Sequence, residues 1–155
     1  MKITIGNLRK IIREVMESPE SVTFGVLYHG TSRSRANEIR KTGFSMDKIG
    51  EKLGDPLPGI STTVDSDIAE EHAEIAAEKY DDEPEVIKVV ASKLKIAPGS
   101  LYFKLWNELG SSDASLQSLK KSGEWDGVCL FDPETGDGIE EQEVLLFEPT
   151  RLTVV

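Results

Sequence analysis

The stretch "LYHGTSRSRANEIRKTGF", residues 27–44, decides how the chain begins its fold. The residues that lead into it predict a strand over 22–28, and Ser32 has the hydroxyl group typical of a helix N-cap. The helix that follows carries apolar residues on one face and ends at Gly43. The pattern therefore predicts that His29, which precedes a glycine and a threonine, lies at a strand-to-helix junction.

The rest of the chain predicts a mixture of helices and short strands. Residues 66–80 have apolar side chains at helical spacing, with His72 on the inward face. The glycines and prolines of residues 50–59 predict a loop. Strands are expected at 60–64, 85–91 and 125–131, a helix at 113–121 that Gly123 ends, and two C-terminal strands separated at Pro149. This order favours an α+β fold over a regularly alternating parallel sheet.

An amphipathic N-terminal helix is expected over residues 6–17. Its apolar residues recur at helical spacing, and Ser18-Pro19 ends it. A helix this short is marginal in water by itself, so we expect it to pack on the body of the protein or on another copy. The predicted organisation is an N-terminal helix, 1–19, and one domain, 20–155, because 155 residues are close to the usual domain length.

Composition and charge exclude several classes of function. The chain is 38% apolar and 30% charged, and no apolar run approaches the length of a membrane span. The formal net charge of −10 disfavours binding to a phosphate backbone, which needs many Lys and Arg side chains. The N-terminus has no continuous apolar run of a secretory signal, and the single Cys129 cannot form an internal disulfide. We therefore expect a cytoplasmic protein with a protein partner, and neither a membrane nor a nucleic-acid partner.

Three strand segments carry polar residues where an apolar pattern would be expected. Side chains of a strand alternate between its faces, so Ser61 and Thr63 share one face of "ISTT". By the same rule Glu141 and Glu143 share one face of "EEQEVLL". Together with "YHGT", these segments predict the polar walls of a cleft.

The three blocks resemble, in the same order, the conserved strand motifs of the ADP-ribosyltransferase superfamily, whose members use NAD. "LYHGTSRSRANEIRKTGF" resembles the histidine-glycine-threonine strand of the diphtheria-toxin and poly-ADP-ribose polymerase branch. "ISTT" and "EEQEVLLFEPTRLTV" resemble instead the branch in which an arginine replaces that histidine. The resemblance covers residue 24 to the end. It implies an ADP-ribosyltransferase-like α+β fold with two short, roughly perpendicular sheets around an NAD cleft and flanking helices.

NAD-binding roles follow from the resemblance for the first two blocks. It implies that His29 hydrogen-bonds the adenosine ribose and that Gly30 clamps the nicotinamide carboxamide through its backbone N–H and C=O. A glycine permits such a close approach of a ligand to the backbone. Thr31 would support the loop or contact ribose, and Ser61 and Thr63 would line the cleft.

One aromatic contact of the family is replaced in this sequence. Ser61 stands where the first branch has a tyrosine that stacks on nicotinamide. His72, on the helix after the strand, is the candidate that would cover the ring instead, with Tyr80 as the second choice. Core packing is the alternative reading of His72, because a lone histidine on an inward face is commonly structural.

The catalytic roles fall on the last block. Glu143 matches the glutamate that contacts the nicotinamide ribose and stabilises positive charge as the glycosidic bond breaks, a task that suits a nearby carboxylate. Glu141 matches the position that orients the acceptor side chain. A carboxylate there suits an arginine, because the guanidinium fork pairs with it bidentately. The alternative reading of Glu141 is an acid on a solvated face.

The predicted function is mono-ADP-ribosyl transfer: NAD is cleaved, nicotinamide is released, and ADP-ribose passes to an acceptor, most readily a protein side chain. One alternative is a catalytically degenerate member that binds NAD or a partner. Another is an ADP-ribosyl- or 2′-phosphotransferase acting on nucleic acid, which the acidic composition disfavours. The opening "MKITIGNLRKIIREVM" resembles the start of many predicted bacteriophage proteins, which points to a phage-encoded, toxin-like effector in the host cytoplasm.

No metal is expected in the site. Residues 132–143 imitate a calcium loop through acids at the first, third and twelfth positions, but Asp137 stands where that loop needs glycine. A hairpin turn is expected there instead. No paired spacing of histidine and cysteine supports zinc.

Overall fold

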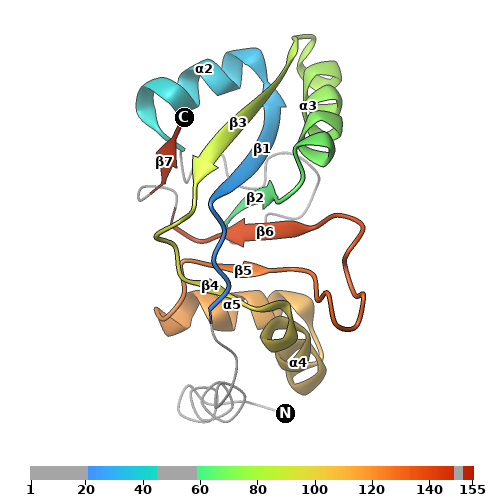
Figure 1. Cartoon of the computed structure of the whole chain (residues 1–155). Helices are drawn as coiled ribbons and strands as arrows, with labels where there is room; N and C mark the ends of the chain where they lie inside the picture. Colours follow the sequence, from blue (N-terminus) through green and yellow to red (C-terminus); the bar gives the residue numbers. More distant parts are fainter. Residues whose placement is uncertain (1–20, 45–58, 149–151) are drawn as a thin grey trace.

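The computed structural model describes residues 21–44, 59–148 and 152–155 (Figure 1). Three sequence-based predictions lie outside the described residues: the helix at 6–17, nearly all of the loop at 50–59, and the strand break at Pro149.

The described residues form four helices and seven strands (Figure 1). In chain order the elements are β1 (Val26–Ser32), α2 (Arg33–Thr42), β2 (Ile60–Thr63), α3 (Ser66–Tyr80), β3 (Pro84–Val90), β4 (Ile96–Ala97), α4 (Gly99–Leu109), α5 (Ser112–Ser122), β5 (Gly127–Cys129), β6 (Glu143–Leu146) and β7 (Thr153–Val154). This mixture of antiparallel and parallel strands with helices confirms the predicted α+β class.

The first strand lies further along the chain than predicted. β1 pairs over its whole length with β3, residue by residue against Pro84–Val90, and this ladder carries it past the predicted end at 28. The prediction that His29 lies at a strand-to-helix junction is therefore wrong, because His29 lies in the middle of β1. α2 follows directly, and Gly43 ends it as predicted, with a φ of 80° that favours glycine.

Helices α3 and α5 form where the sequence predicts them, because their ends carry strong local signals. Asp65 caps α3 by accepting a hydrogen bond from the backbone N–H of Asp67 at 2.8 Å. Ser111 caps α5 in the same way, and Gly123 ends it in the left-handed conformation.

Helix α4 was not predicted. Its N-cap position is Pro98, which has no side-chain oxygen, so the usual start signal is missing. Burial of one helix face against α5 and the sheet stabilises it instead, through Leu101, Tyr102 and Leu105.

The strands form one curled sheet in the order β4-β5-β6-β2-β1-β3-β7. Two short, roughly perpendicular sheets were predicted, whereas hydrogen bonds join all the described strands into one sheet that changes direction at one place. Only one residue pair, Tyr28↔Thr63, joins β1 to β2, whereas four pairs join β2 to β6. In Figure 1, β1 and β3 accordingly lie along the height of the view, β1 pointing up and β3 pointing down, while β6 and β5 lie across it.

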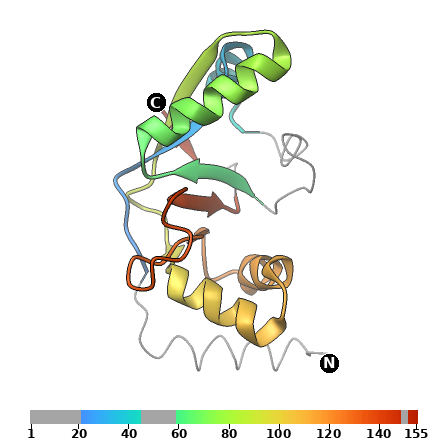
Figure 2. The same cartoon turned by 90° about the vertical axis from the view of Figure 1, so that its right-hand side faces the viewer.

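Two apolar clusters attach helices to the two halves of this sheet. In one half, Leu27, Ile87 and Val89 of β1 and β3 pack against Ala36 of α2. In the other half, β5 and β6 pack against α4 and α5, which lie together beneath them (Figure 2). The buried residues of this second cluster include Leu101, Leu105, Leu116, Leu119, Val128, Leu145 and Phe147.

Helix α3 packs on β1 through small residues. Its buried side chains are all alanines, Ala69, Ala73, Ala76 and Ala77. A Cβ added to Gly30 would lie 2.0 Å from the backbone oxygen of Ala69, so any side chain at this position would push the helix away. Gly30 thus permits close packing of α3 on β1.

Candidate functional site

Ser61 of β2 links the two residues that the sequence singles out most strongly. Its backbone oxygen accepts a hydrogen bond from Nδ1 of His29 at 2.8 Å. Its hydroxyl donates to Oε1 of Glu143 at 2.7 Å. The predicted approach of His29, Ser61 and Glu143 is therefore observed, with three strands each supplying one residue.

The register of β2 and β6 explains the contact between Ser61 and Glu143. Ser61 pairs with Leu145 and Thr63 pairs with Glu143, so Ser61 and Glu143 are diagonal neighbours on one face. Diagonal cross-strand neighbours are within reach of a long side chain, which is what Glu143 provides.

Glu143 is partly buried and lies on the face of β6 that α4 and α5 cover. Leu145, two residues further along the same face of β6, packs in one cluster with Tyr102 of α4. Burial raises the pKa of the Tyr102 phenol, and the negative charge of Glu143 raises it further. The charge of Glu143 therefore acts on the Tyr102 phenol of α4.

Glu141 does not share the face of Glu143, contrary to the prediction from strand alternation. β6 begins only at Glu143, and Gln142 has a φ of 45°, which turns the chain just before the strand. Glu141 therefore lies in the turn, where its Oε2 contacts Nε2 of His72 on α3 at 3.4 Å. The side chains of His72 and Glu141 are 36% and 65% exposed.

Position and contacts of His72 differ from both sequence readings. It is half-buried rather than part of the core, and it faces Glu141 rather than the Ser61–Glu143 pair. Tyr80, the second choice for covering nicotinamide, lies at the far end of α3, is 40% exposed, and receives a hydrogen bond from Arg35 at 3.0 Å.

The two threonines of the predicted cleft are interior groups. The Thr63 hydroxyl donates to the backbone oxygen of Glu141 at 3.1 Å and accepts from the backbone N–H of Asp65 at 3.2 Å. Thr63 and Thr31 are each 1% exposed. The Thr63 hydroxyl therefore holds the backbone between β2 and the turn at Glu141, while Thr31 is buried in β1.

Gly30 is approached closely by protein backbone on one side. Helix α3 covers the side on which a Cβ would lie, so no ligand can approach Gly30 from that side. On the other face of β1, His29 makes an edge-to-face contact with Phe44, with ring centroids 5.3 Å apart. Phe44 thereby fixes the plane of the imidazole ring.

Phe44 and Tyr102 are site neighbours that sequence reasoning missed. Phe44 follows the predicted helix end at Gly43, and an apolar residue at that position is a known companion of a glycine C-cap. That signal could have placed it over the preceding strand. Tyr102 had no comparable signal, because α4 itself has no recognisable start.

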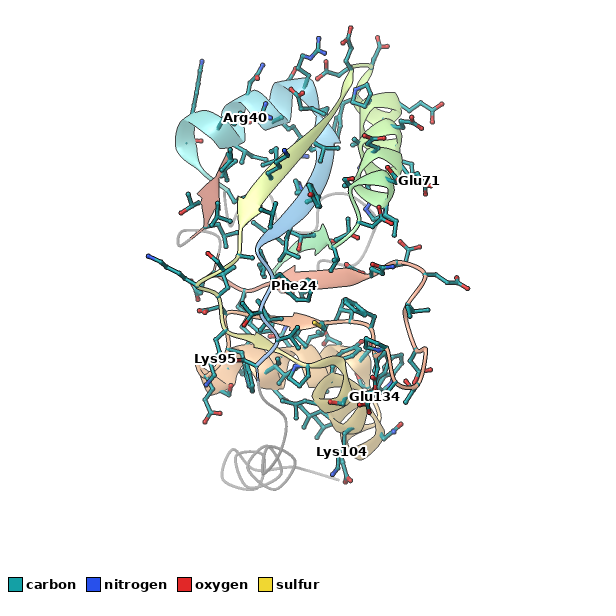
Figure 3. All side chains as sticks on the ribbon, viewed as in Figure 1. Phe24, Arg40, Glu71, Lys95, Lys104 and Glu134 are labelled. Atoms are coloured by element: carbon teal, nitrogen blue, oxygen red, sulfur yellow. The ribbon has the colours of Figure 1, made fainter. Side chains whose placement is uncertain are left out.

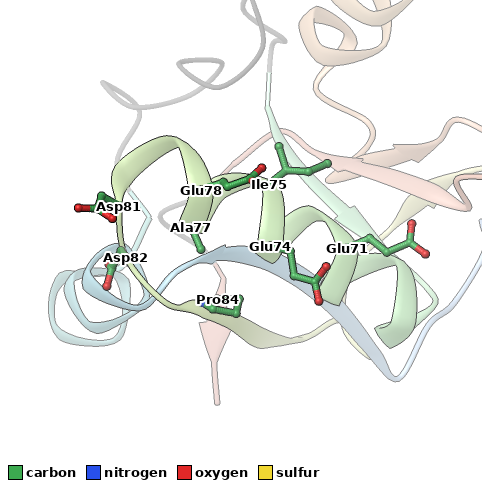
Figure 4. A pocket seen from close by; sticks show the side chains of 8 residues that line it. All are labelled: Glu71, Glu74, Ile75, Ala77, Glu78, Asp81, Asp82 and Pro84. Atoms are coloured by element: carbon green, nitrogen blue, oxygen red, sulfur yellow. The ribbon is translucent and has the colours of Figure 1, made fainter.

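A hollow is lined by residues of α3 and of the turn that follows it, with Pro84 of β3 (Figure 4). Five of its eight lining residues are acidic, and Ile75 beside them is 55% exposed. Other charged side chains also lie on the outside of the fold, such as the labelled Arg40, Glu71, Lys95, Lys104 and Glu134 (Figure 3). The hollow is part of this charged exterior.

Comparison with models of protein families, with curated proteins and with solved structures gives no match for this chain. Within the described ranges, no helix combines the length and the apolar character that a bilayer crossing requires. The fold and the side-chain geometry are therefore the grounds for a functional interpretation.

Proposed function

We propose that the protein cleaves NAD and transfers its ADP-ribose unit to an acceptor, most readily a protein side chain. The observation that carries the proposal is that Ser61 contacts both other residues. Its carbonyl accepts a hydrogen bond from His29, and its hydroxyl donates one to Glu143. Three residues that the family resemblance selects independently, from separate parts of the sequence, thus converge in one place.

Glu143 is suited to the central step. As the bond between ribose C1 and the nicotinamide nitrogen breaks, its electron pair returns to the nitrogen and nicotinamide leaves as a neutral molecule. Positive charge then develops on the ribose, and a fixed carboxylate nearby stabilises it. The hydrogen bond from Ser61 fixes one oxygen of Glu143 and leaves the other available for the ribose.

The acceptor completes the reaction. One of its nitrogen or oxygen atoms donates an electron pair to C1, forms the new bond and releases a proton to water. Holding acceptor and ribose together supplies much of the rate gain of a two-substrate reaction. A cytoplasmic location, where NAD and protein acceptors are both at hand, and an effector role in a phage-infected host belong to the same proposal.

The test is release of nicotinamide from NAD by the purified protein and by Glu143→Gln. The substitution keeps shape and hydrogen bonding but removes the charge, so we expect release to fall about 100-fold or more while NAD still binds. Glu140→Gln, a neighbouring exposed acid, is the matched control and should leave the rate unchanged.

Two results would reject the proposal. Full activity in Glu143→Gln would remove the catalytic role of this carboxylate. Binding of NAD without release of nicotinamide by the unaltered protein would favour a catalytically degenerate NAD-binding module instead.

A further inference from the structure

We infer that the outer face of α4 is the docking site of the N-terminal segment, residues 1–20, of the same chain. The sequence leaves open whether the helix expected at 6–17 packs on the body of the protein or on another copy. The described structure offers it a partly exposed aromatic surface within reach. The inference does not depend on NAD cleavage.

Three aromatic rings lie together on α4. Tyr102 is buried in the cluster that α4 shares with α5. Phe103 stacks on Trp106, with ring centroids 6.1 Å apart and 18° between the ring planes, and Trp106 lies 5.8 Å from Tyr102. Phe103 is half-buried and Trp106 is 41% exposed. The buried cluster therefore continues to the outside of α4 through two large apolar rings.

Other exposed apolar side chains among the described residues have a different setting. Ile75 of α3 lines a hollow together with five acidic residues, and Tyr80 receives a hydrogen bond from Arg35. A single exposed apolar residue is normal for a protein surface, whereas an apolar patch marks a contact site. The stacked rings of Phe103 and Trp106 form such a patch.

The described chain starts in the half of the molecule that contains α4. The backbone N–H of Val22 donates a hydrogen bond to the carbonyl of Ile96 at 2.9 Å. Ile96 begins β4, and Pro98, two residues later, occupies the N-cap position of α4. In Figure 1 the segment that leads into β1 accordingly runs past β6 and β5 toward α4 and α5. The N-terminal segment is therefore joined to the body beside the start of α4.

The lengths of the two elements agree. Residues 18–21 span at most about 14 Å when extended. Trp106 lies about 10 Å along the helix axis from Gly99, the first residue of α4. A helix over 6–17 is about 18 Å long, close to the length of about 16 Å for α4. The expected helix can therefore lie along α4 without any change in the described fold.

The chemistry of the two surfaces also agrees. The apolar face of the segment comprises Leu8, Ile11, Ile12, Val15 and Met16. Burial of these side chains against aromatic rings offsets the instability of a short isolated helix. The acidic hollow complements the basic residues of the segment, but it is lined by α3, in the other half of the sheet. The apolar face and the point of attachment therefore both favour α4.

A double-mutant cycle on the full chain tests the inference through the melting temperature, Tm. Ile12→Asp puts a charge into the apolar face of the segment and should lower Tm by about 5 °C. Trp106→Ala should lower it as well, and the double variant should lose little beyond the larger single loss, because both substitutions remove one contact. Lys10→Asp, on the opposite side of the expected helix, should leave Tm nearly unchanged. Ile75→Ala, an exposed apolar residue of α3, should give a loss that adds to that of Ile12→Asp.

Acrylamide quenching of tryptophan fluorescence is a second measurement, and it decides the question if Trp106→Ala does not fold. Ile12→Asp should increase quenching because Trp106 loses its cover, whereas Trp125, which is 5% exposed, contributes little in either protein. No loss of Tm in Ile12→Asp, additive losses in Ile12→Asp and Trp106→Ala, or unchanged quenching would each overturn the inference. A Tm that rises with protein concentration would also overturn it, because a second copy would then supply the segment.

Discussion

Two carboxylates that are separated by only one residue lie in contrasting parts of this molecule. Glu143 belongs to β6, is partly buried, and is held by the Ser61 hydroxyl. Glu141 lies in the turn before the strand, is largely exposed, and is held by His72 of α3. The left-handed conformation of Gln142 separates them, because it breaks the alternation that would put both side chains on one face. A short sequence distance therefore says little about a shared environment.

The largest effect that would test this contrast is expected in Ser61→Ala. The substitution removes the hydroxyl that fixes Glu143 but keeps the backbone carbonyl that receives His29. A hydrogen bond to a charged group contributes about 1.5–3 kcal/mol, so nicotinamide release should fall about 30-fold. The rate of release with NAD at saturation measures it.

The control for Ser61→Ala is Ser100→Ala, an exposed serine of α4, which should retain full activity. If Ser61→Ala retains full activity as well, the hydrogen bond does not orient Glu143 for catalysis, and the contrast between the two carboxylates would be structural only.

A smaller and more selective effect is expected in Glu141→Gln. The amide still accepts a hydrogen bond from His72 but carries no charge for a cationic acceptor. Transfer to agmatine, a small guanidine used as the acceptor, should fall about tenfold, while nicotinamide release stays within about twofold of the unaltered protein. Equal loss of both activities would show that Glu141 acts on NAD and would erase the distinction between the two carboxylates.

The smallest effect concerns Cys129, a buried residue of the strand that pairs with β6 next to Glu143. Cys129 of β5 lies opposite Val144, the residue after Glu143, and is 2% exposed. Burial raises the pKa of its thiol from 9.0 to about 12. Because the folded pKa lies above the unfolded one, this group costs no stability below pH 9.0, and stability is lost as the pH rises from there toward 12.

The corresponding measurement is urea unfolding at pH 8 and at pH 10. The contribution of Cys129 predicts a loss of about 1 kcal/mol between the two, because the unfolded thiol ionises while the folded one does not. Cys129→Ala should show a smaller loss over the same interval even though its stability at pH 8 is lower. An identical loss of stability in both proteins would mean that the Cys129 thiol is not buried away from water.

Local signals explain which elements could be predicted. α3 and α5 have side-chain caps and apolar spacing within their own residues, and both form where expected. α4 has neither, because Pro98 occupies its cap position, and its stability depends on the cluster it shares with α5 and β6. The extension of β1 beyond the predicted strand likewise depends on a partner, β3, more than fifty residues further along the chain.

The sequence by itself determined the α+β class, the helices with strong caps, the glycine end of α2, and the residue types that a carboxylate-centred site requires. These features depend on neighbours one to four positions apart, so a linear pattern records them. Only the tertiary structure decided that Ser61 joins His29 and Glu143 and that His72 meets Glu141. The contacts of Ser61 span 32 and 82 residues, and they depend on strand register, on the bend between β1 and β2 and on the turn at Gln142, which packing of the whole chain sets.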